Sequence, residues 1–388
     1  MSLRLPVYLD NNATTPMDPR VLEEMLPYFI EKFGNAASRT HSYGWEAEEA
    51  VDIAREQIAS LIGAHPNEIV FTSGATEAVN LAIKGVLEND PRHQKHVITV
   101  CTEHKAVLDS CKHVENGQAT VTYLPVRNDG TIELQNVENA ITEETILISV
   151  MYANNETGVI YPIREIASIA RRHNILFMTD ATQAVGKIPV NVQDEGIDLL
   201  TLSAHKLYGP KGIGALFVRK KSPAVHLTAQ IDGGGHERNM RSGTLNVPGI
   251  AGFGKACELC MEEMESESER LRKIRDIFES ALMELEGVSV NGNMGLRLPH
   301  TTNIAFQGID GEKLIFEAGN DIAFSRSSAC TSATLEPSYV LKAMGMSDEA
   351  IHTSFRFSFG RFSTEEHALH SVKVLSRIVN AHRSERVF

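Results

Sequence analysis

The sequence predicts an α/β fold, in which a mainly parallel seven-stranded sheet is flanked by helices and followed by a smaller α+β region. Apolar, β-rich runs alternate with helical stretches such as 46–61 and 162–173, a pattern typical of parallel sheets with helices on both faces. Several runs are continuously apolar, as strands covered on both faces are. The seven strands are expected near residues 69–72, 97–101, 120–124, 145–151, 175–179, 198–202 and 213–218.

The last part of the chain has a different organisation. The run 213–218 follows its predecessor after only a turn, so it is expected to be antiparallel to it. From about Val247 a long amphipathic helix begins, and it leads to strands expected at 302–306 and 353–359. Because 388 residues can bury more than one core, two domains are expected.

The bulk composition is that of an ordinary globular enzyme, with 42% hydrophobic and 22% charged residues. The net charge of −13, with no basic cluster longer than 219–221, argues against nucleic-acid binding. No apolar run approaches the length of a membrane span, and the amino terminus lacks a signal-peptide pattern. A cytoplasmic protein with no membrane partner is therefore expected.

The cysteines do not indicate a disulfide framework, because there are five of them at scattered positions. Cys257 and Cys260 have the CxxC spacing that many zinc sites use. They fall within a helical pattern, however, and no second pair exists to complete a site. They are interpreted as two thiols that pack a helix.

A lysine stands where one of the expected strands meets a turn rich in glycine and proline. Lys206 comes shortly after the strand 198–202 and just before Gly209-Pro210. A lysine amine forms Schiff bases when it is held in a desolvated site near other cations, and His205 is the candidate for such a cation. The alternative is a surface lysine after a strand. Residues at other strand ends favour the reactive lysine.

Asp180 directly follows the buried strand 175–179, so it lies at the strand's carboxyl end, where open α/β sheets bind ligands. Pyridoxal phosphate needs a carboxylate beside its ring nitrogen, because the protonated pyridine is the electron sink for carbanion chemistry. Gln183 is placed to donate to the phenolic oxygen of this cofactor. The alternative for Asp180 is a helix N-cap, and its position alone leaves both open.

Two further strand ends carry polar residues. Strand 69–72 runs into the small-residue turn 73–77 and then into a helical pattern, an arrangement that presents backbone N–H groups to a phosphate. Strand 97–101 is followed by His104, which could stack on a cofactor ring and move protons near neutral pH. The alternatives are a plain capping turn and a polar turn histidine.

The strand expected at 353–359 alternates between two kinds of side chain. Its three phenylalanines face a core, and Arg356 faces the other way with two serines, on a face expected to be exposed. An arginine in this setting can hold a carboxylate through two hydrogen bonds. The alternative is an exposed edge arginine. Arg361, on a neighbouring turn, is interpreted as structural.

Eight motifs occur in the order in which cysteine desulfurases carry them, and the sequence resembles that family from about residue 7 to about residue 375. These are pyridoxal-phosphate enzymes of the class V aminotransferase type, with an aspartate-aminotransferase-like large domain. The longer, Ser/Thr-rich cysteine loop is similar to that of the branch that serves iron–sulfur cluster assembly. The motifs are YLDNNATTP (8–16), TSGATE (72–77), TEHKAV (102–107), NNETG (154–158), DATQAVGK (180–187), SAHK (203–206), RSGT (241–244) and SACTS (328–332).

The resemblance implies a complete site and an oligomeric state. Thr244 is expected to reach across the interface of a homodimer. His104 is expected to assist acid–base steps, and Arg356 and Asn155 to bind the α-carboxylate of L-cysteine. Residues 13–258 should form the large domain, and residues 1–12 should fold back onto 259–388 to form the small one. The implied cofactor-binding residues are Ala75, Thr76, His104, Asn155, Asp180, Gln183, Ser203, His205, Lys206 and Thr244.

Cys330 lies in a small, polar, unpatterned stretch at about 325–336, which predicts a mobile loop. The thiolate of an exposed cysteine is a nucleophile; the alternative is a tolerated surface cysteine, and the resemblance identifies the nucleophile. No resident metal is expected, although Cys330 could transiently ligate the iron of a cluster. This chain has Arg326-Ser327-Ser328 where many relatives have Ser-Gly-Ser, so Arg326 adds a positive charge that could lower the thiol pKa.

The predicted function is the removal of sulfur from L-cysteine, with Lys206 as the base at the α-carbon. The products are L-alanine and a persulfide on Cys330. The sulfur is expected to pass to acceptor proteins, such as an iron–sulfur cluster scaffold, with tRNA thiolation as a second use. The alternatives are a selenocysteine lyase, an aminotransferase or epimerase on this fold, and a non-catalytic scaffold for cluster assembly.

Overall fold

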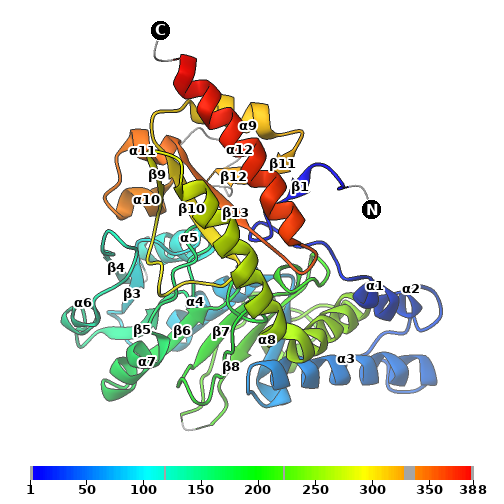
Figure 1. Cartoon of the computed structure of the whole chain (residues 1–388). Coiled ribbons are helices and arrows are strands. Elements are labelled where there is room, and N and C mark those ends of the chain that lie inside the picture. The colour runs from blue at the N-terminus through cyan, green and yellow to red at the C-terminus, as the bar shows by residue number, and fades with distance from the viewer. Residues whose placement is uncertain (1–2, 118, 222, 327–336, 386–388) are drawn as a thin grey trace.

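The structure is a computed structural model that describes residues 3–117, 119–221, 223–326 and 337–385. Its largest element is a seven-stranded sheet with the strand order β2-β8-β7-β6-β5-β3-β4 (Figure 1). Neighbouring strands are parallel, except that β8 is antiparallel to both β2 and β7. The predicted strands and the antiparallel last strand are confirmed. The strands are β2 (Ile69–Thr72), β3 (His96–Val100), β4 (Thr120–Leu124), β5 (Thr145–Ser149), β6 (Leu176–Asp180), β7 (Leu199–Ser203) and β8 (Gly214–Val218).

Helices cover both faces of this sheet, so successive side chains of one strand enter two different cores. Val70 packs into the core on one face, whereas Ile69 and Phe71 pack into the core on the other, as the period of two in a strand requires. This double burial explains the continuous apolar runs. The helices on the first face are α4 (Ala75–Asn89) and α5 (Lys105–Glu115); those on the second include α3 (Ser42–Leu61), α7 (Ile163–Arg172) and the first half of α8 (Val247–Met283).

The helix predicted over 46–61 begins earlier, at Ser42. His41 caps it, because its Nδ1 accepts a hydrogen bond from the backbone N–H of Gly44 at 3.2 Å. Histidine is not among the common N-cap residues, which is why the sequence did not indicate this start. The remaining helices of this half are short: α1 (Pro19–Met25), α2 (Pro27–Ile30) and α6 (Leu134–Asn139).

A second, antiparallel sheet has the strand order β12-β13-β10-β9 and a core of its own. The amino-terminal residues pack on this part of the molecule: β1 (Val7–Tyr8) pairs in parallel with β11 (Ile322–Ala323), and Asp10 bridges to Ser358. The elements here are β9 (Val288–Val290), β10 (Thr301–Phe306), β12 (Ser325–Arg326), β13 (Ser354–Ser358), α9 (Gly311–Ala318), α10 (Tyr339–Ala343), α11 (Asp348–His352) and α12 (Glu365–Glu385).

Helix α8 links the two parts (Figure 1). Phe253 on its first half packs in the core of the large sheet, and Phe278 on its second half packs in the core of the small one. Since α8 is continuous through residue 258, the division into domains at that point stays a prediction. Cys257 and Cys260 are buried in this helix, so their interpretation as packing thiols is confirmed. Neither α8 nor another helix within the described ranges is apolar enough to cross a membrane.

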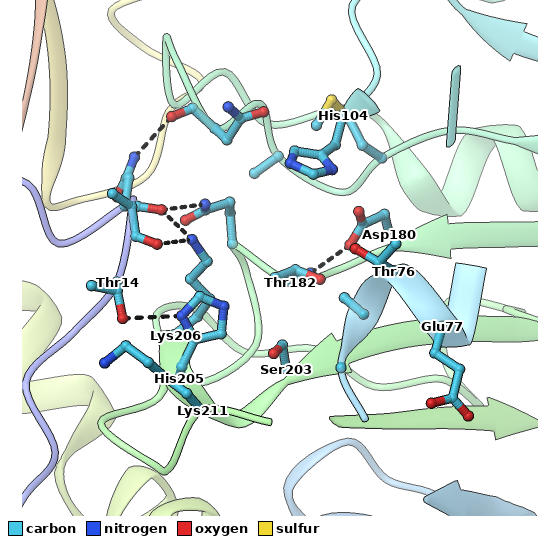
Figure 2. Close-up of a pocket in the computed structure, with 18 of the residues that line it drawn as sticks. Thr14, Thr76, Glu77, His104, Asp180, Thr182, Ser203, His205, Lys206 and Lys211 are labelled. Atoms are coloured by element: carbon cyan, nitrogen blue, oxygen red, sulfur yellow. Dashed lines mark hydrogen bonds between the residues drawn. The ribbon is translucent and has the colours of Figure 1, made fainter. Parts of the chain in front are cut away.

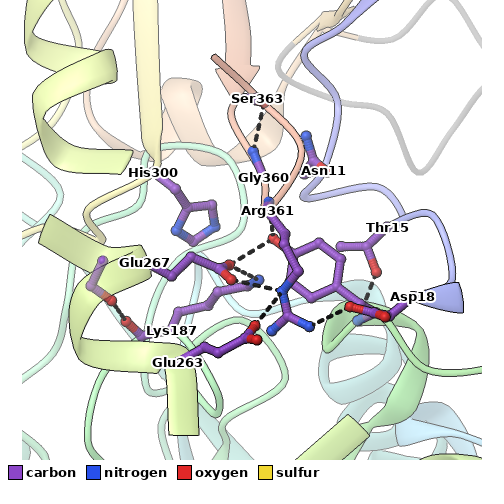
Figure 3. Close-up of polar contacts among 12 residues, drawn as sticks. Asn11, Thr15, Asp18, Lys187, Glu263, Glu267, His300, Gly360, Arg361 and Ser363 are labelled. Carbon is purple, nitrogen blue, oxygen red and sulfur yellow. Dashed lines mark hydrogen bonds and ion pairs between the residues drawn. The ribbon is translucent and has the colours of Figure 1, made fainter. Parts of the chain in front are cut away.

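Arg361 joins the amino-terminal segment, α8 and the small sheet in a buried ionic cluster (Figure 3). Its guanidinium pairs with Asp18 at 2.8 Å and with Glu267 of α8 at 2.8 Å. The Tyr208 ring lies 4.4 Å from the guanidinium carbon, and its hydroxyl donates to Glu267 at 3.0 Å. Because Arg361 does not line the cavity described below, its interpretation as a structural residue is confirmed.

Candidate active site

The carboxyl ends of β2, β3, β5, β6 and β7 meet at one edge of the large sheet and surround a cavity of about 580 Å³ (Figure 2). This volume suits a small ligand or cofactor. The amino-terminal segment 12–14 and Arg356 of the small sheet complete the walls. The predicted residues that line the cavity are Ala75, Thr76, His104, Asn155, Asp180, Gln183, Ser203, His205, Lys206 and Arg356.

One predicted residue is not brought together with the others, and another lies outside the described residues. Thr244 does not line the cavity of its own chain, and it is exposed. Its predicted reach into a second subunit stays a prediction. Cys330 lies outside the described residues, and so does most of the loop predicted around it. Arg326, at the start of that loop, pairs with Glu312 at 3.3 Å.

Lys206 enters the cavity from the turn that follows β7 (Figure 2). Its Nζ donates a hydrogen bond to the backbone carbonyl of Ala13 at 2.6 Å and another to the carbonyl of Asn12. Tyr208 follows in the left-handed region of backbone conformation, with a φ of 62°. This conformation turns the chain two residues after Lys206. The two hydrogen bonds show that the lysine side chain points toward the amino-terminal segment, which closes one side of the cavity.

His205 does not supply the positive charge expected beside Lys206. Burial, together with the nearby charges of Lys206 and Lys211, lowers the pKa of His205 to about 4, so the imidazole is neutral near pH 7. That expectation was wrong, because burial disfavours the charged imidazole. The cations that line the cavity with Lys206 are Lys211 and Arg356. The neutral ring of His205 lies within hydrogen-bond distance of the Thr14 hydroxyl, 3.1 Å away.

Asp180 is the last residue of β6, and it lines the cavity. Its Oδ1 accepts hydrogen bonds from the Thr182 backbone N–H at 3.0 Å and from the Thr201 hydroxyl at 3.2 Å. A turn and not a helix follows β6, so the alternative of a helix N-cap is wrong, and the two bonds fix the carboxylate's orientation. Both use the same oxygen, so Oδ2 can accept from a protonated ring nitrogen in the cavity.

The first turn of α4 also lines the cavity, and its backbone N–H groups have no partner within the helix. Ala75 and Thr76 lie there, and such N–H groups bind phosphate. Gly214 of β8 allows the close approach, since a Cβ on it would lie 2.7 Å from the Cα of Gly74. Glu77 lines the cavity as well, and Arg241 pairs with it at 2.7 Å. Burial opposes ionisation of Glu77, but its bonds to Arg241 and Ser73 lower its pKa overall.

His104 and Gln183 also line the cavity. His104 caps α5, since its Nδ1 accepts from the backbone N–H of Ala106 at 3.2 Å. Neutral His104 therefore carries its proton on Nε2. Gln183 donates through Nε2 to the carbonyl of Asn12 at 3.0 Å. Both side chains are thus oriented by protein contacts before any ligand is considered.

Arg356 is buried, with 1% of its surface exposed, so the expectation that it lies on an exposed sheet face was wrong. The amino-terminal segment and the turn after β5 cover that face. Its Nη2 donates to Asp10 at 2.7 Å, and its Nη1 donates to the carbonyl of Asn155 at 3.0 Å. Its Nε and the Asn155 Oδ1 are both buried without a hydrogen-bond partner among the described residues. Two unpaired polar atoms at one wall indicate a place for a polar ligand.

The part that the amino-terminal segment plays in the site was not predicted from the sequence. The carbonyl of Asn12 accepts hydrogen bonds from Lys206 and Gln183, and its side chain bonds the carbonyl of Asn155 and the Thr301 hydroxyl. Asp10 pairs with Arg356. The only signal was the polar motif at 8–16 itself. No strand or helix pattern there indicates which distant elements it contacts.

The model of the aminotransferase class-V family matches residues 7–369, and the chain belongs to the class V aminotransferase family. Two curated relatives, each called cysteine desulfurase IscS, narrow the assignment within that family. The one from Anaeromyxobacter sp. (strain Fw109-5) is 53% identical over 96% of this chain and 92% of its own length. The one from Serratia proteamaculans (strain 568) is 52% identical over 97% and 93%. Within its family, this chain is one of the cysteine desulfurases, and the resemblance seen in the motifs is confirmed.

Solved structures agree with this assignment. A NifS-like protein superposes with a TM-score of 0.90 at 37% identity, covering 97% of this chain and all of that one. SspA, solved in complex with cysteine, superposes with a TM-score of 0.82 at 39% identity, covering 92% of this chain and 99% of that one. The expected α/β fold is confirmed.

Proposed function

We propose that this protein is a pyridoxal-phosphate-dependent cysteine desulfurase that converts L-cysteine to L-alanine and keeps the sulfur as a persulfide on Cys330. The observation that carries the proposal is a single cavity in which Lys206 and Asp180 lie with Arg356. The match to relatives called cysteine desulfurase, at more than half of all positions, supports the choice of reaction.

The residues present fit the cofactor. The N–H groups at the start of α4, with Ser203 and His205, would hold its phosphate, and Asp180 Oδ2 would face its ring nitrogen. Lys206 would bond to its aldehyde, and His104 and Gln183 would contact its ring. When bound, pyridoxal phosphate supplies an electron sink that stabilises negative charge on the substrate's α-carbon. The carboxylate of Asp180 keeps that ring nitrogen protonated.

L-Cysteine would bind through its carboxylate to Arg356 and Asn155. The buried, unpaired Nε of Arg356 supports this role, because a carboxylate would give this N–H an acceptor. Asn155 would contribute through its amide N–H group, since a carboxylate only accepts hydrogen bonds. Lys206, whose Nζ points into the cavity, removes the proton from the α-carbon and later returns a proton to the product. His104 would donate the proton on its Nε2 near the substrate's side chain and would then accept a proton back at the same nitrogen.

Sulfur transfer requires a thiolate. The Cys330 thiolate attacks the sulfur of L-cysteine, so that an S–S bond forms while the bond from that sulfur to Cβ breaks. The electron pair of the broken bond stays with the carbon, which is protonated to give L-alanine. The other four cysteines are poor candidates: burial raises the thiol pKa of Cys101, Cys111, Cys257 and Cys260, and thiolate is the reactive form.

The sulfur held as a persulfide has to be passed to another molecule. The acceptors are proteins in the cytoplasm, such as an iron–sulfur cluster scaffold.

A homodimer is supported by exposed apolar side chains on and between α1, α2 and the start of α3, a feature typical of interaction surfaces. Thr244 would then face the partner's cavity. The exposed side chains are Leu22, Leu26, Phe29, Ile30, Phe33, Tyr43 and Trp45.

The test of this function is a product assay on the purified protein with bound cofactor. L-Alanine and protein-bound sulfur should appear from L-cysteine without an added keto acid. A requirement for a keto acid would make the protein an aminotransferase. Much faster turnover of L-selenocysteine would make it a selenocysteine lyase, and no turnover of either would make it a scaffold.

Replacement of Arg356 by lysine should lower kcat/KM for L-cysteine by about tenfold or more, because lysine keeps the charge but loses the two-pronged geometry. A charge-assisted hydrogen bond is worth about 1.5–3 kcal/mol. Cofactor content, measured by absorbance, should stay unchanged. Arg361→Lys is the matched control, since that arginine lies outside the cavity wall. Unchanged kinetics for Arg356→Lys with a loss for Arg361→Lys would assign the carboxylate to Arg361.

A further inference from the structure

Asp10 forms an ion pair with Arg356, the arginine that is proposed to bind the substrate's carboxylate. Its Oδ1 accepts from Nη2 of Arg356 at 2.7 Å, and its Oδ2 accepts from the Ser325 hydroxyl at 2.7 Å. Both carboxylate oxygens are therefore used, which fixes the side chain's orientation. The backbone is held as well, because Asp10 bridges to Ser358, the last residue of β13.

The guanidinium keeps capacity for a second anion. Arg356 has five N–H donors, of which one is bonded to Asp10 and one to the Asn155 carbonyl. Its Nε, buried and unpartnered within the described residues, is among the rest. A substrate carboxylate would thus bind beside Asp10 on the same buried cation, and two carboxylates that share one arginine repel each other.

The sharing of Arg356 between Asp10 and a ligand carboxylate affects both the substrate and the product. L-Cysteine and L-alanine carry the same α-carboxylate, so an arginine without a counterion would hold the product as firmly as the substrate. Resting the proposal on the function given above, we infer that Asp10 is a positioning residue that orients Arg356 and weakens its hold on α-carboxylates. Its carboxylate sets the affinity of the cavity for amino acids and favours release of L-alanine.

The test compares L-alanine with ethylamine, which is the same molecule without the carboxylate. Dissociation constants are measured for the protein with bound cofactor, from the change in cofactor absorbance on titration. Asp10→Asn should bind L-alanine about tenfold more tightly, the order expected for removing a like charge at close range in a partly buried site. Its affinity for ethylamine should stay within about twofold of wild type, because ethylamine brings no second anion.

Three variants separate this charge effect from a structural one. Asp10→Glu keeps the charge and should return L-alanine affinity toward the wild-type value. Asp10→Ser is a second neutral variant, with the same tightening expected, should Asp10→Asn fold poorly. Asp18→Asn is the matched control: it breaks an aspartate–arginine pair of similar length, 2.8 Å to Arg361, outside the cavity wall, and should change neither constant.

Each outcome decides a different point. If neither wild type nor the neutral variants at Asp10 prefer L-alanine over ethylamine, the proposed carboxylate site at Arg356 is wrong. If wild type has that preference but the neutral variants at Asp10 bind L-alanine with equal or lower affinity, only the inference about Asp10 is overturned. Equal tightening of both ligands, or the same change in Asp18→Asn, would also overturn it.

Discussion

Replacement of Lys206 by alanine is expected to lower the rate of L-alanine formation from L-cysteine by about a thousandfold, within the range that a positioned acid–base group contributes. Lys206 is the lysine whose amine is held inside the cavity by two backbone carbonyls. In deuterated water, exchange of the α-proton of L-cysteine should stop in the variant.

Two other lysines serve as controls. Lys211 lines the same cavity, and Lys187 is a buried lysine whose pKa is lowered by burial, but it lies in the cluster around Arg361 (Figure 3). Lys211→Ala should retain α-proton exchange, and so should Lys187→Met. Borohydride should attach the cofactor irreversibly to Lys206 in the wild type, as peptide mapping would find. Attachment to Lys211 or Lys187 would contradict the assignment.

The large sheet could be predicted from the sequence because its strands are buried on both faces. A strand such as Gly214–Val218, with all five residues buried, is continuously apolar, and that signal is local. The site residues at strand ends were predictable for a second reason: the carboxyl ends of parallel strands lie at the same edge of the sheet. Asp180 and Lys206 both belong to this group.

The contacts between distant segments were not predictable in the same way. Arg356 alternates with phenylalanines as a residue on an exposed face would, yet segments about two hundred and about three hundred and fifty residues away cover it. Alternation shows which side chains share a face, but it does not show what packs against that face. The charge of His205 was mispredicted for the same reason, because its burial depends on the amino-terminal segment at Thr14.

Replacement of Cys330 by serine should separate cofactor chemistry from sulfur transfer. Serine is nearly isosteric with cysteine, but its hydroxyl is a far weaker nucleophile than a thiolate at neutral pH. The variant should therefore retain cofactor and still exchange the α-proton of L-cysteine in deuterated water, because neither Lys206 nor Asp180 is changed. It should form no persulfide, and its rate of L-alanine formation should fall by about a thousandfold or more, as expected when a covalent nucleophile is removed.

Lys206→Ala is expected to behave differently, since that variant should lose both α-proton exchange and L-alanine formation. Cys101→Ser is the matched control, because Cys101 is only partly buried and burial raises its thiol pKa; it should behave as wild type. Mass spectrometry of wild type after brief exposure to L-cysteine should find one added sulfur on the Cys330 peptide. Sulfur on Cys101 or Cys111 instead, or continued L-alanine release by the serine variant, would show that the nucleophile lies elsewhere. A loss of α-proton exchange in Cys330→Ser would show that the thiol takes part before the sulfur is transferred.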